Sequence, residues 1–97
     1  FFGSTSHFQM LSKQVPDAAK YVIVRMDRVP YIDQSGLYAL EDVLLDLEKR
    51  DIHPLIVDVQ NQPLYLLQSI DIVPDLIPEE HLFDNFNDCI AWIKAHV

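Results

Sequence analysis

Cysteine and glycine are scarce in this sequence. Its 97 residues contain one cysteine, Cys89, so an internal disulfide is excluded, which suits a reducing compartment such as the cytoplasm. The two glycines, Gly3 and Gly36, stand alone, and neither a GxGxxG nor a GxxxxGK phosphate-binding loop is present. We therefore expect no cofactor.

Basic residues are also few. Seven Lys and Arg against 15 Asp and Glu give a formal net charge of -8. Nucleic-acid binding requires clustered cations to neutralise phosphates, so this balance argues against DNA or RNA and favours a neutral or basic protein partner. The histidines (His7, His53, His81 and His96) are far apart, and none pairs with another His or Cys at i+3 or i+4. No metal site is predicted.

Long apolar runs are absent as well. None approaches the roughly 20 residues that cross a bilayer, and the opening FFGSTSHF lacks the features of a signal peptide. We expect this piece to be soluble, without direct membrane insertion. Because it opens on Phe1 and Phe2 without an initiating Met, we also expect a fragment of a longer protein.

Strand-like and helical segments alternate along the chain. KYVIVRM (20–26) and PLIVDV (54–59) are typical of buried strands, FF at the start is the expected end of another, and HLF (81–83) is too short to assign alone. Helices are expected over 6–15, over 36–50, over 64–69 after Asn61 and Pro63, and after a cap at Asp84. This alternation predicts one α/β domain over residues 1–97 with parallel strand pairing.

The 36–50 helix has apolar side chains on two faces. Leu37, Leu40, Val43, Leu44 and Leu47 share the face expected to be buried. At 100° per residue Tyr38 and Leu45 point away from it, among Glu41, Asp42 and Lys49, as a docking ridge with an acidic rim would. The alternative is that another part of the protein covers them. In the last helix, the expected buried stripe is Phe86, Ile90, Ile93 and Val97.

Ser35 begins this helix and admits two interpretations. Its hydroxyl can serve as the helix N-cap, worth roughly 1 kcal/mol. It can also be a phosphorylation site, because a phosphate there would meet the positive end of the helix dipole while Asp33 repels it, which suits switching a surface. A hydrolase built on Ser35 is disfavoured because no GxSxG or Cys-His signature occurs, and we expect no enzymatic activity.

Several segments together resemble the STAS domain. VPYIDQSGLYALE (29–41) after the strand KYVIVRM is similar to the signature of this family, which is shared by anti-sigma-factor antagonists and the cytoplasmic tails of SulP anion transporters. FFGS at the start, LEKRDI (47–52) and IPEEHLF followed by DNFNDCIAW resemble the SulP branch. The resemblance implies an α/β STAS fold: a mixed, mostly parallel sheet of four or five strands flanked by about four helices, with the first strand missing from this fragment.

The same resemblance implies a function. It points to a regulatory, protein-interaction domain on the cytoplasmic side of the inner membrane, in a bacterial transporter for sulfate, bicarbonate or dicarboxylates. Its partner would be a cytoplasmic protein or the transporter's own membrane domain. In the antagonists, a kinase phosphorylates the serine in the place of Ser35, so the alternative is a free-standing anti-sigma-factor antagonist regulated at Ser35. In either branch the expected contact surface comprises Asp33, Gln34, Ser35, Gly36, Tyr38, Glu41, Asp42 and Leu45.

Overall fold

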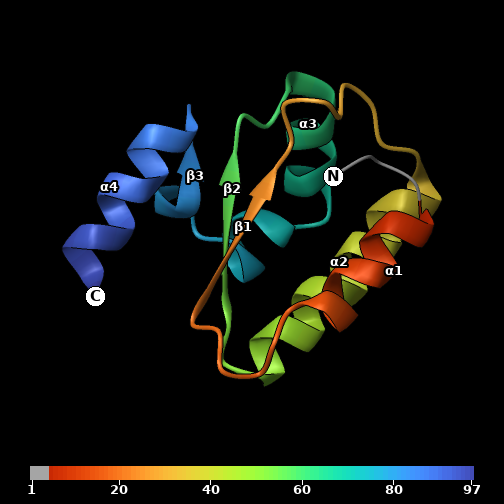
Figure 1. Cartoon of the computed structure of the whole chain (residues 1–97). Helices are drawn as coiled ribbons and strands as arrows, with labels where there is room; N and C mark the ends of the chain where they lie inside the picture. The colour runs from red at the N-terminus through yellow and green to blue at the C-terminus, as the bar shows by residue number, and fades with distance from the viewer. Residues whose placement is uncertain (1–4) are drawn as a thin grey trace.

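Helices and strands alternate as the sequence pattern predicts (Figure 1). The computed structural model describes the backbone of residues 5–97 and the side chains from residue 10 onward. The main elements in chain order are α1 (Thr5–Gln14), β1 (Tyr21–Arg25), α2 (Gln34–Lys49), β2 (His53–Val57), α3 (Asn61–Ser69), β3 (Leu82–Phe83) and α4 (Phe86–His96). A π-helical turn (Ile72–Leu76) and a 3-10 turn (Glu79–His81) connect α3 to β3.

The strands form a parallel sheet in the order β1-β2-β3. Tyr21 pairs with His53 at one end of the β1–β2 ladder, and Val57 pairs with Phe83 between β2 and β3. The predicted α/β fold class is confirmed. The described residues hold three strands, all parallel, rather than the expected four or five with mixed pairing. The strand end expected at Phe1 and Phe2 lies outside the described residues.

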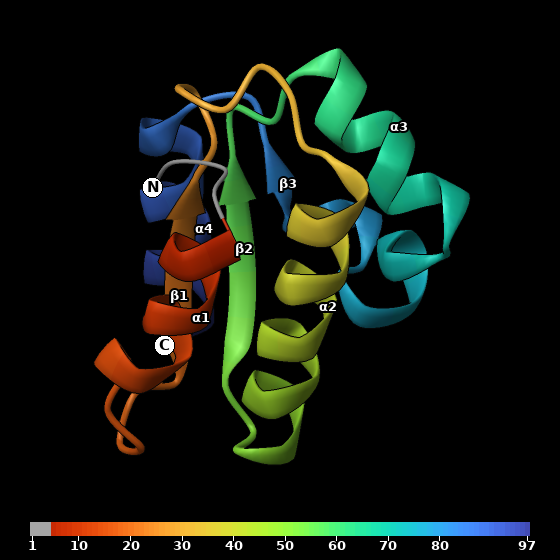
Figure 2. The same cartoon turned by 90° about the vertical axis from the view of Figure 1, so that its right-hand side faces the viewer.

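Helices cover both faces of the sheet. In Figures 1 and 2, α1 and α2 lie on one face and α4 on the other. Alternate strand residues face opposite ways, so Val24 and Ile56 join the main core with α2 and α3, whereas Leu55 and Val57 pack with Cys89 of α4. Burial on both faces of β2 explains its unbroken apolar run of Leu55, Ile56 and Val57, each 0% exposed.

Helix α2 contributes the most regular part of the core. The predicted face is buried as expected: Leu37, Leu40, Val43, Leu44 and Leu47 are each at most 4% exposed. Truncating one such leucine to alanine typically costs about 2–5 kcal/mol, because the lost burial is joined by a cavity. This face fixes the rotation of α2, and therefore also determines which side chains of the helix meet solvent.

Helix α4 differs from the sequence prediction in its cap and in its buried stripe. Asn85, not Asp84, is the N-cap, and its side chain accepts a hydrogen bond from the Asp88 N–H at 2.8 Å. Phe86 is 37% and Val97 84% exposed, so the predicted stripe is wrong at both ends. Cys89 is the buried residue of α4 instead, because it packs against Leu55 and Val57 of β2.

Candidate docking surface

Asp33 determines where α2 begins. Its backbone is extended (φ -85°, ψ 174°), and its Oδ1 accepts a hydrogen bond from the Gly36 N–H at 2.7 Å. Asp33 is therefore the N-cap, and the prediction of a Ser35 cap is wrong. The helix starts two residues earlier than expected, at Gln34 rather than Gly36, so that Ser35 is already in the first turn. The Asp33 carboxylate also lies at the positive end of the helix dipole, which favours a negative charge.

Ser35 remains accessible in this arrangement. Ser35 is exposed in the first turn of α2. Its hydroxyl does not cap the helix, because Asp33 does so. A phosphate on Ser35 would lie near the unpaired N–H groups of the first turn and close to the Asp33 carboxylate. Ser35 is thus placed where a modification would change the charge of the surface without disturbing the core.

Tyr38 and Leu45 point outward as predicted. They are 48% and 40% exposed, and no described part of the chain buries them. Seven residues apart, they lie on one side of α2, and Gln34 Nε2 donates to Tyr38 Oη at 3.2 Å one turn earlier. The prediction that these two apolar side chains face solvent is confirmed.

The other residues of the predicted surface fall into three groups. Gln34 and Asp33 are exposed, as is Asp42, which lies toward α1 beside a hollow of about 320 Å³ that Ser12 and Lys13 also line. Glu41, one helical turn after Leu37 and Tyr38, is half-buried. Gly36 is buried and donates its N–H to Asp33, so it supports the surface from below rather than lining it.

The loop before α2 is held by a residue that sequence reasoning missed. Gln62, in the first turn of α3, accepts from the Ile32 N–H at 2.8 Å and donates to the Ile32 carbonyl at 3.0 Å. This pair of bonds joins α3 to the loop that carries Tyr31 (66% exposed) and the Asp33 cap. No sequence signal could have shown it, because the contact spans 30 residues and uses a side chain common on helix surfaces.

A charged network holds the other flank of α2. Arg50 donates to Asp17 at 2.9 Å, to Asp46 at 3.1 Å and to the Val15 carbonyl, and Ser12 donates to Asp46 at 2.5 Å. The hydrogen bond from Ser12, followed by that from Arg50, lowers the pKa of the Asp46 carboxyl below its ordinary value of 3.8. Helix α1 is thereby tied to one flank of α2 through Asp46 and Arg50.

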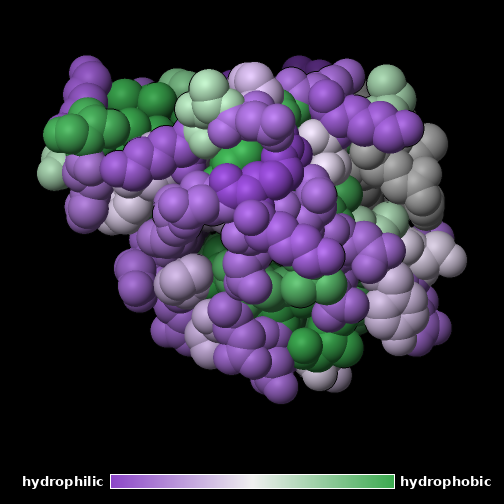
Figure 3. Space-filling model, turned by 90° about the horizontal axis from the view of Figure 1, so that it is seen from below, coloured by the Kyte–Doolittle hydropathy of each residue, from purple (hydrophilic) through white to green (hydrophobic). Residues whose placement is uncertain are grey.

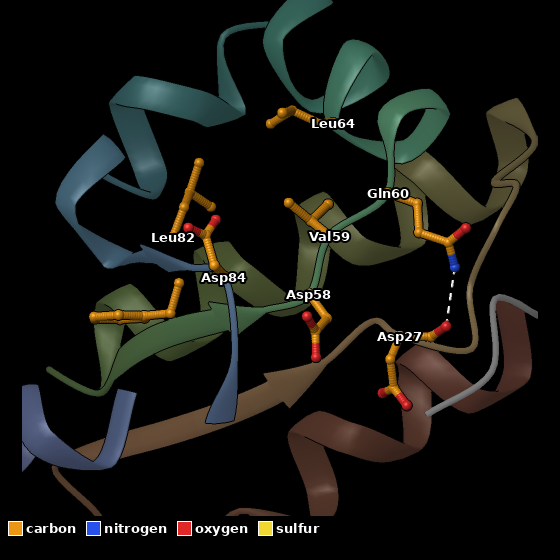
Figure 4. A pocket seen from close by; sticks show the side chains of 8 residues that line it. Asp27, Asp58, Val59, Gln60, Leu64, Leu82 and Asp84 are labelled. Carbon is orange, nitrogen blue, oxygen red and sulfur yellow. Dashed lines mark hydrogen bonds between the residues drawn. The ribbon is translucent and has the colours of Figure 1, made fainter. Parts of the chain in front are cut away.

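A second hollow, of about 610 Å³, opens where the strands end (Figure 4). Asp58 and Asp84 directly follow β2 and β3, Asp27 lies two residues beyond β1, and Gln60 Nε2 donates to the Asp27 carbonyl at 2.9 Å. The three carboxylates repel phosphate-bearing ligands. Among the residues that the structure describes, no group of three or more His, Cys, Asp or Glu is arranged to hold a metal ion. The hollow is therefore a weaker candidate than the α2 surface.

This parallel sheet and the Asp33–Ser35–Gly36 helix start define a STAS domain, and the chain belongs to that family, whose model matches residues 1–89. The crystal structure of a sulfate transporter family protein from Wolinella succinogenes is similar, with a TM-score of 0.82, 29% identity, and coverage of 98% of this chain and 78% of that one. The STAS domain of a SulP transporter from Vibrio cholerae has the same fold, with a TM-score of 0.79, 22% identity, and coverage of 95% and 71%.

A curated relative belongs to a much longer protein. Sulfate transporter 1.1 of Arabidopsis thaliana is 29% identical over 80 residues, which are 82% of this chain. The chain spans only 12% of that relative's length. In the described range, no helix combines the length and apolar character needed to span a membrane.

Proposed function

We propose that this chain is the regulatory STAS domain of a SulP-type transporter for sulfate or a related anion such as bicarbonate or a dicarboxylate. It acts on the cytoplasmic side of the membrane by binding rather than by catalysis. The family match and the likeness to sulfate transporter proteins support the assignment to a transporter. The exposed pair Tyr38 and Leu45, beside the acidic Glu41 and Asp42, carries the proposal of a binding surface.

The surface suits docking because its apolar side chains are exposed while the helix that carries them is rigidly seated. The opposite face of α2 is buried and both of its flanks are held, by Gln62 on one side and by Arg50 on the other. A preordered surface loses little conformational entropy on binding. Its partner is a cytoplasmic protein or the transporter's own membrane domain.

The test replaces Tyr38 and Leu45 together with lysine in the transporter that carries this domain. Both side chains are exposed, so we expect the melting temperature to change little while capture of the partner, or crosslinking to the membrane domain, is lost. The charge-matched control replaces Tyr65 (69% exposed) and Val97 (84% exposed) with lysine. A collapse of stability in the first variant, or an equal loss of capture in the control, would contradict the proposed surface.

The alternative function, a free-standing antagonist of an anti-sigma factor, draws on the exposure of Ser35. It requires a kinase partner that phosphorylates this hydroxyl. Incubating the chain with candidate kinases and locating phosphate by mass spectrometry tests it directly. Reading the gene upstream of Phe1 separates the two proposals, because a transporter requires a run of membrane-spanning helices there and an antagonist requires none.

A further inference from the structure

A small groove separates the beginning of α2 from α3. Leu37 of α2, Leu66 of α3 and Ile70 directly after α3 supply its apolar lining, and Tyr31 and Tyr38 stand beside them. Its volume is about 220 Å³. Small-molecule sites commonly hold roughly 300–1,000 Å³, so this space is better suited to one inserted side chain than to a cofactor.

Its two tyrosines are the most exposed large hydrophobic side chains that line it. Tyr31 is 66% and Tyr38 48% exposed, although the groove beside them is apolar. Tyrosine is enriched at protein interfaces because it offers a large contact area, a polar tip and only two rotatable side-chain torsions. Two such residues flanking an apolar recess resemble the central part of an interface, where an anchoring side chain is enclosed.

The walls of the groove are fixed before anything binds. Gln62 and Ser69 line it from α3, and the two hydrogen bonds between Gln62 and the Ile32 backbone hold the Tyr31 loop against that helix. Asp33, at the other wall, is held by its bond to the Gly36 N–H. The recess is therefore a built feature of the fold, and its shape does not depend on a loop closing over it.

Charge indicates what the groove binds. Between Arg28 and Lys94 the sequence contains only two Lys or Arg residues, Lys49 and Arg50. Both lie at the far end of α2, where Arg50 is bonded to Asp17 and Asp46. Among the described residues, Asp33 is the one charged residue that lines the groove, and Glu41 follows Leu37 and Tyr38 by one helical turn, so the formal charge of the groove lining is negative.

We propose that the α2–α3 groove binds a cationic amphipathic segment of a protein partner, which inserts one large apolar side chain between Tyr31 and Tyr38. Lysine or arginine side chains of that segment pair with Asp33 and Glu41. This inference rests on the proposed docking function and specifies the partner's chemistry. It also extends the surface from α2 alone to the loop at Tyr31 and to α3, neither of which the sequence had marked.

The probe is a labelled 15-residue amphipathic peptide of leucine and lysine, titrated into the 97-residue chain by fluorescence anisotropy. A peptide with glutamate in place of lysine is its counterpart. We expect saturable binding of the first at low salt, weaker binding at about 0.5 M salt because surface charges are screened, and no binding of the second. Binding of the glutamate peptide with comparable affinity would overturn the proposal.

Variants separate the groove from general attraction to an acidic protein. Tyr31→Ser with Tyr38→Ser leaves the net charge unchanged and is expected to weaken binding by about tenfold or more, as loss of a central anchor does. Tyr65→Ser is the matched control, because Tyr65 is 69% exposed on α3 but does not line the groove, and its affinity should be unchanged. Equal affinities for all three proteins would overturn the groove.

Neutral variants test the role of charge. Asp33→Asn keeps a capping side chain and Glu41→Gln keeps its length, so the combined variant should fold normally but bind the lysine peptide more weakly and with less dependence on salt. Unchanged salt dependence would contradict the proposed pairing. Circular dichroism of each variant confirms folding before titration.

The same measurements distinguish this inference from the broader function. If the double-serine variant abolishes self-association in sedimentation experiments, the occupant is a second copy of the chain and the proposal is wrong. If the lysine peptide binds the chain but the whole transporter captures no partner, the groove remains a binding site and the proposed docking function is refuted. Partner capture without peptide binding would refute only the groove.

Discussion

Two polar side chains, Asp33 and Gln62, hold the start of α2 in place. Asp33 caps the helix through the Gly36 N–H, and Gln62 bonds both backbone groups of Ile32. Both polar groups of Ile32 are satisfied although the residue is only 1% exposed, which avoids the cost of burying unpaired donors and acceptors. The exposed residues between them, Tyr31 and Ser35, are thereby held on a fixed backbone.

The capping role leads to a test at the level of one residue. Asp33→Ala should lower the free energy of unfolding by about 0.5–2 kcal/mol, because a first-turn N–H loses its acceptor. Asp33→Asn should lower the free energy of unfolding much less, since asparagine is also a good N-cap residue. Ser35→Ala is the comparison: it should be nearly neutral, because Ser35 lies in the first turn and not at the cap. Urea denaturation measures all three, and a loss at Ser35 equal to that at Asp33 would contradict this assignment.

The residue scale also shows what the sequence could not predict. The sequence placed Asp33 and Ser35 two residues apart, and both are good capping residues, so propensity alone could not choose between them. The choice depends on where the Ile32 backbone is held, which Gln62 determines from 30 residues away. The outward positions of Tyr38 and Leu45 were predictable because they follow from helical periodicity alone.

Among the elements, α2 was predicted best and α4 least well. α2 has a continuous apolar stripe over 16 residues, so its buried face is unambiguous. α4 is shorter, and its hydrophobic residues are spread around the helix, so the choice of Cys89 over Phe86 depends on the position of the sheet. Around it, Trp92 packs edge-on against Tyr21, His81 and Phe83 and stacks on His96 with ring centroids 3.9 Å apart.

Because His81 belongs to this aromatic cluster, we expect folding stability to depend on pH. Burial lowers the pKa of His81 below its ordinary value of 6.5, neighbouring His53 and His96 lower it further, and Glu80 acts in the opposite direction. Well above pH 6.5 His81 is neutral in both the folded and the unfolded chain, so its titration costs no folding stability there. As the pH falls through 6.5 the unfolded chain takes up the proton first, and folding stability decreases.

We therefore expect the free energy of unfolding to fall between about pH 7.5 and 5.5, and to fall less in His81→Phe, which keeps an aromatic ring 5.0 Å from Trp92 but does not titrate. Urea denaturation followed by the fluorescence of Trp92, the one tryptophan in the sequence, measures this. At about pH 8 the two proteins should be closer in stability than at pH 5.5. A parallel decline in both would show that His81 is not the group responsible.

At the scale of the whole molecule, the fold is a parallel sheet between helices, and the chain carries an excess of acidic residues. Seen from the end where the strands begin, the surface is mainly hydrophilic, with hydrophobic side chains at the centre and toward α4 (Figure 3). The formal charge of -8 is distributed unevenly, because residues 51–93 contain no Lys or Arg. This charge imbalance could be predicted from the sequence. The position of an apolar groove beside acidic residues could not, because the groove is formed by segments about 30 residues apart in the sequence.

Such an excess of one sign should weaken the folded state through self-repulsion, because folding brings the carboxylates together. Attractive pairs such as Arg50 with Asp46 are partly exposed, and each contributes only about 0–1 kcal/mol. Added salt should therefore remove less stability by weakening these pairs than it adds by weakening the repulsion between carboxylates. Raising sodium chloride from about 0.02 to 0.3 M should therefore stabilise the chain. A gain on the order of 1 kcal/mol would raise the Tm by roughly 4–8 °C for a domain of this size.

The matched variant removes three exposed carboxylates without changing side-chain size: Asp75→Asn, Glu79→Gln and Glu80→Gln. At low salt it should melt at a higher temperature than the parent chain, and its Tm should rise less with added salt, because less repulsion remains to be screened. Differential scanning calorimetry at neutral pH gives both quantities. If salt lowers the Tm of the parent chain, attractive ion pairs outweigh repulsion, and the acidic chain must then be held together by local networks such as that of Arg50, Asp17 and Asp46.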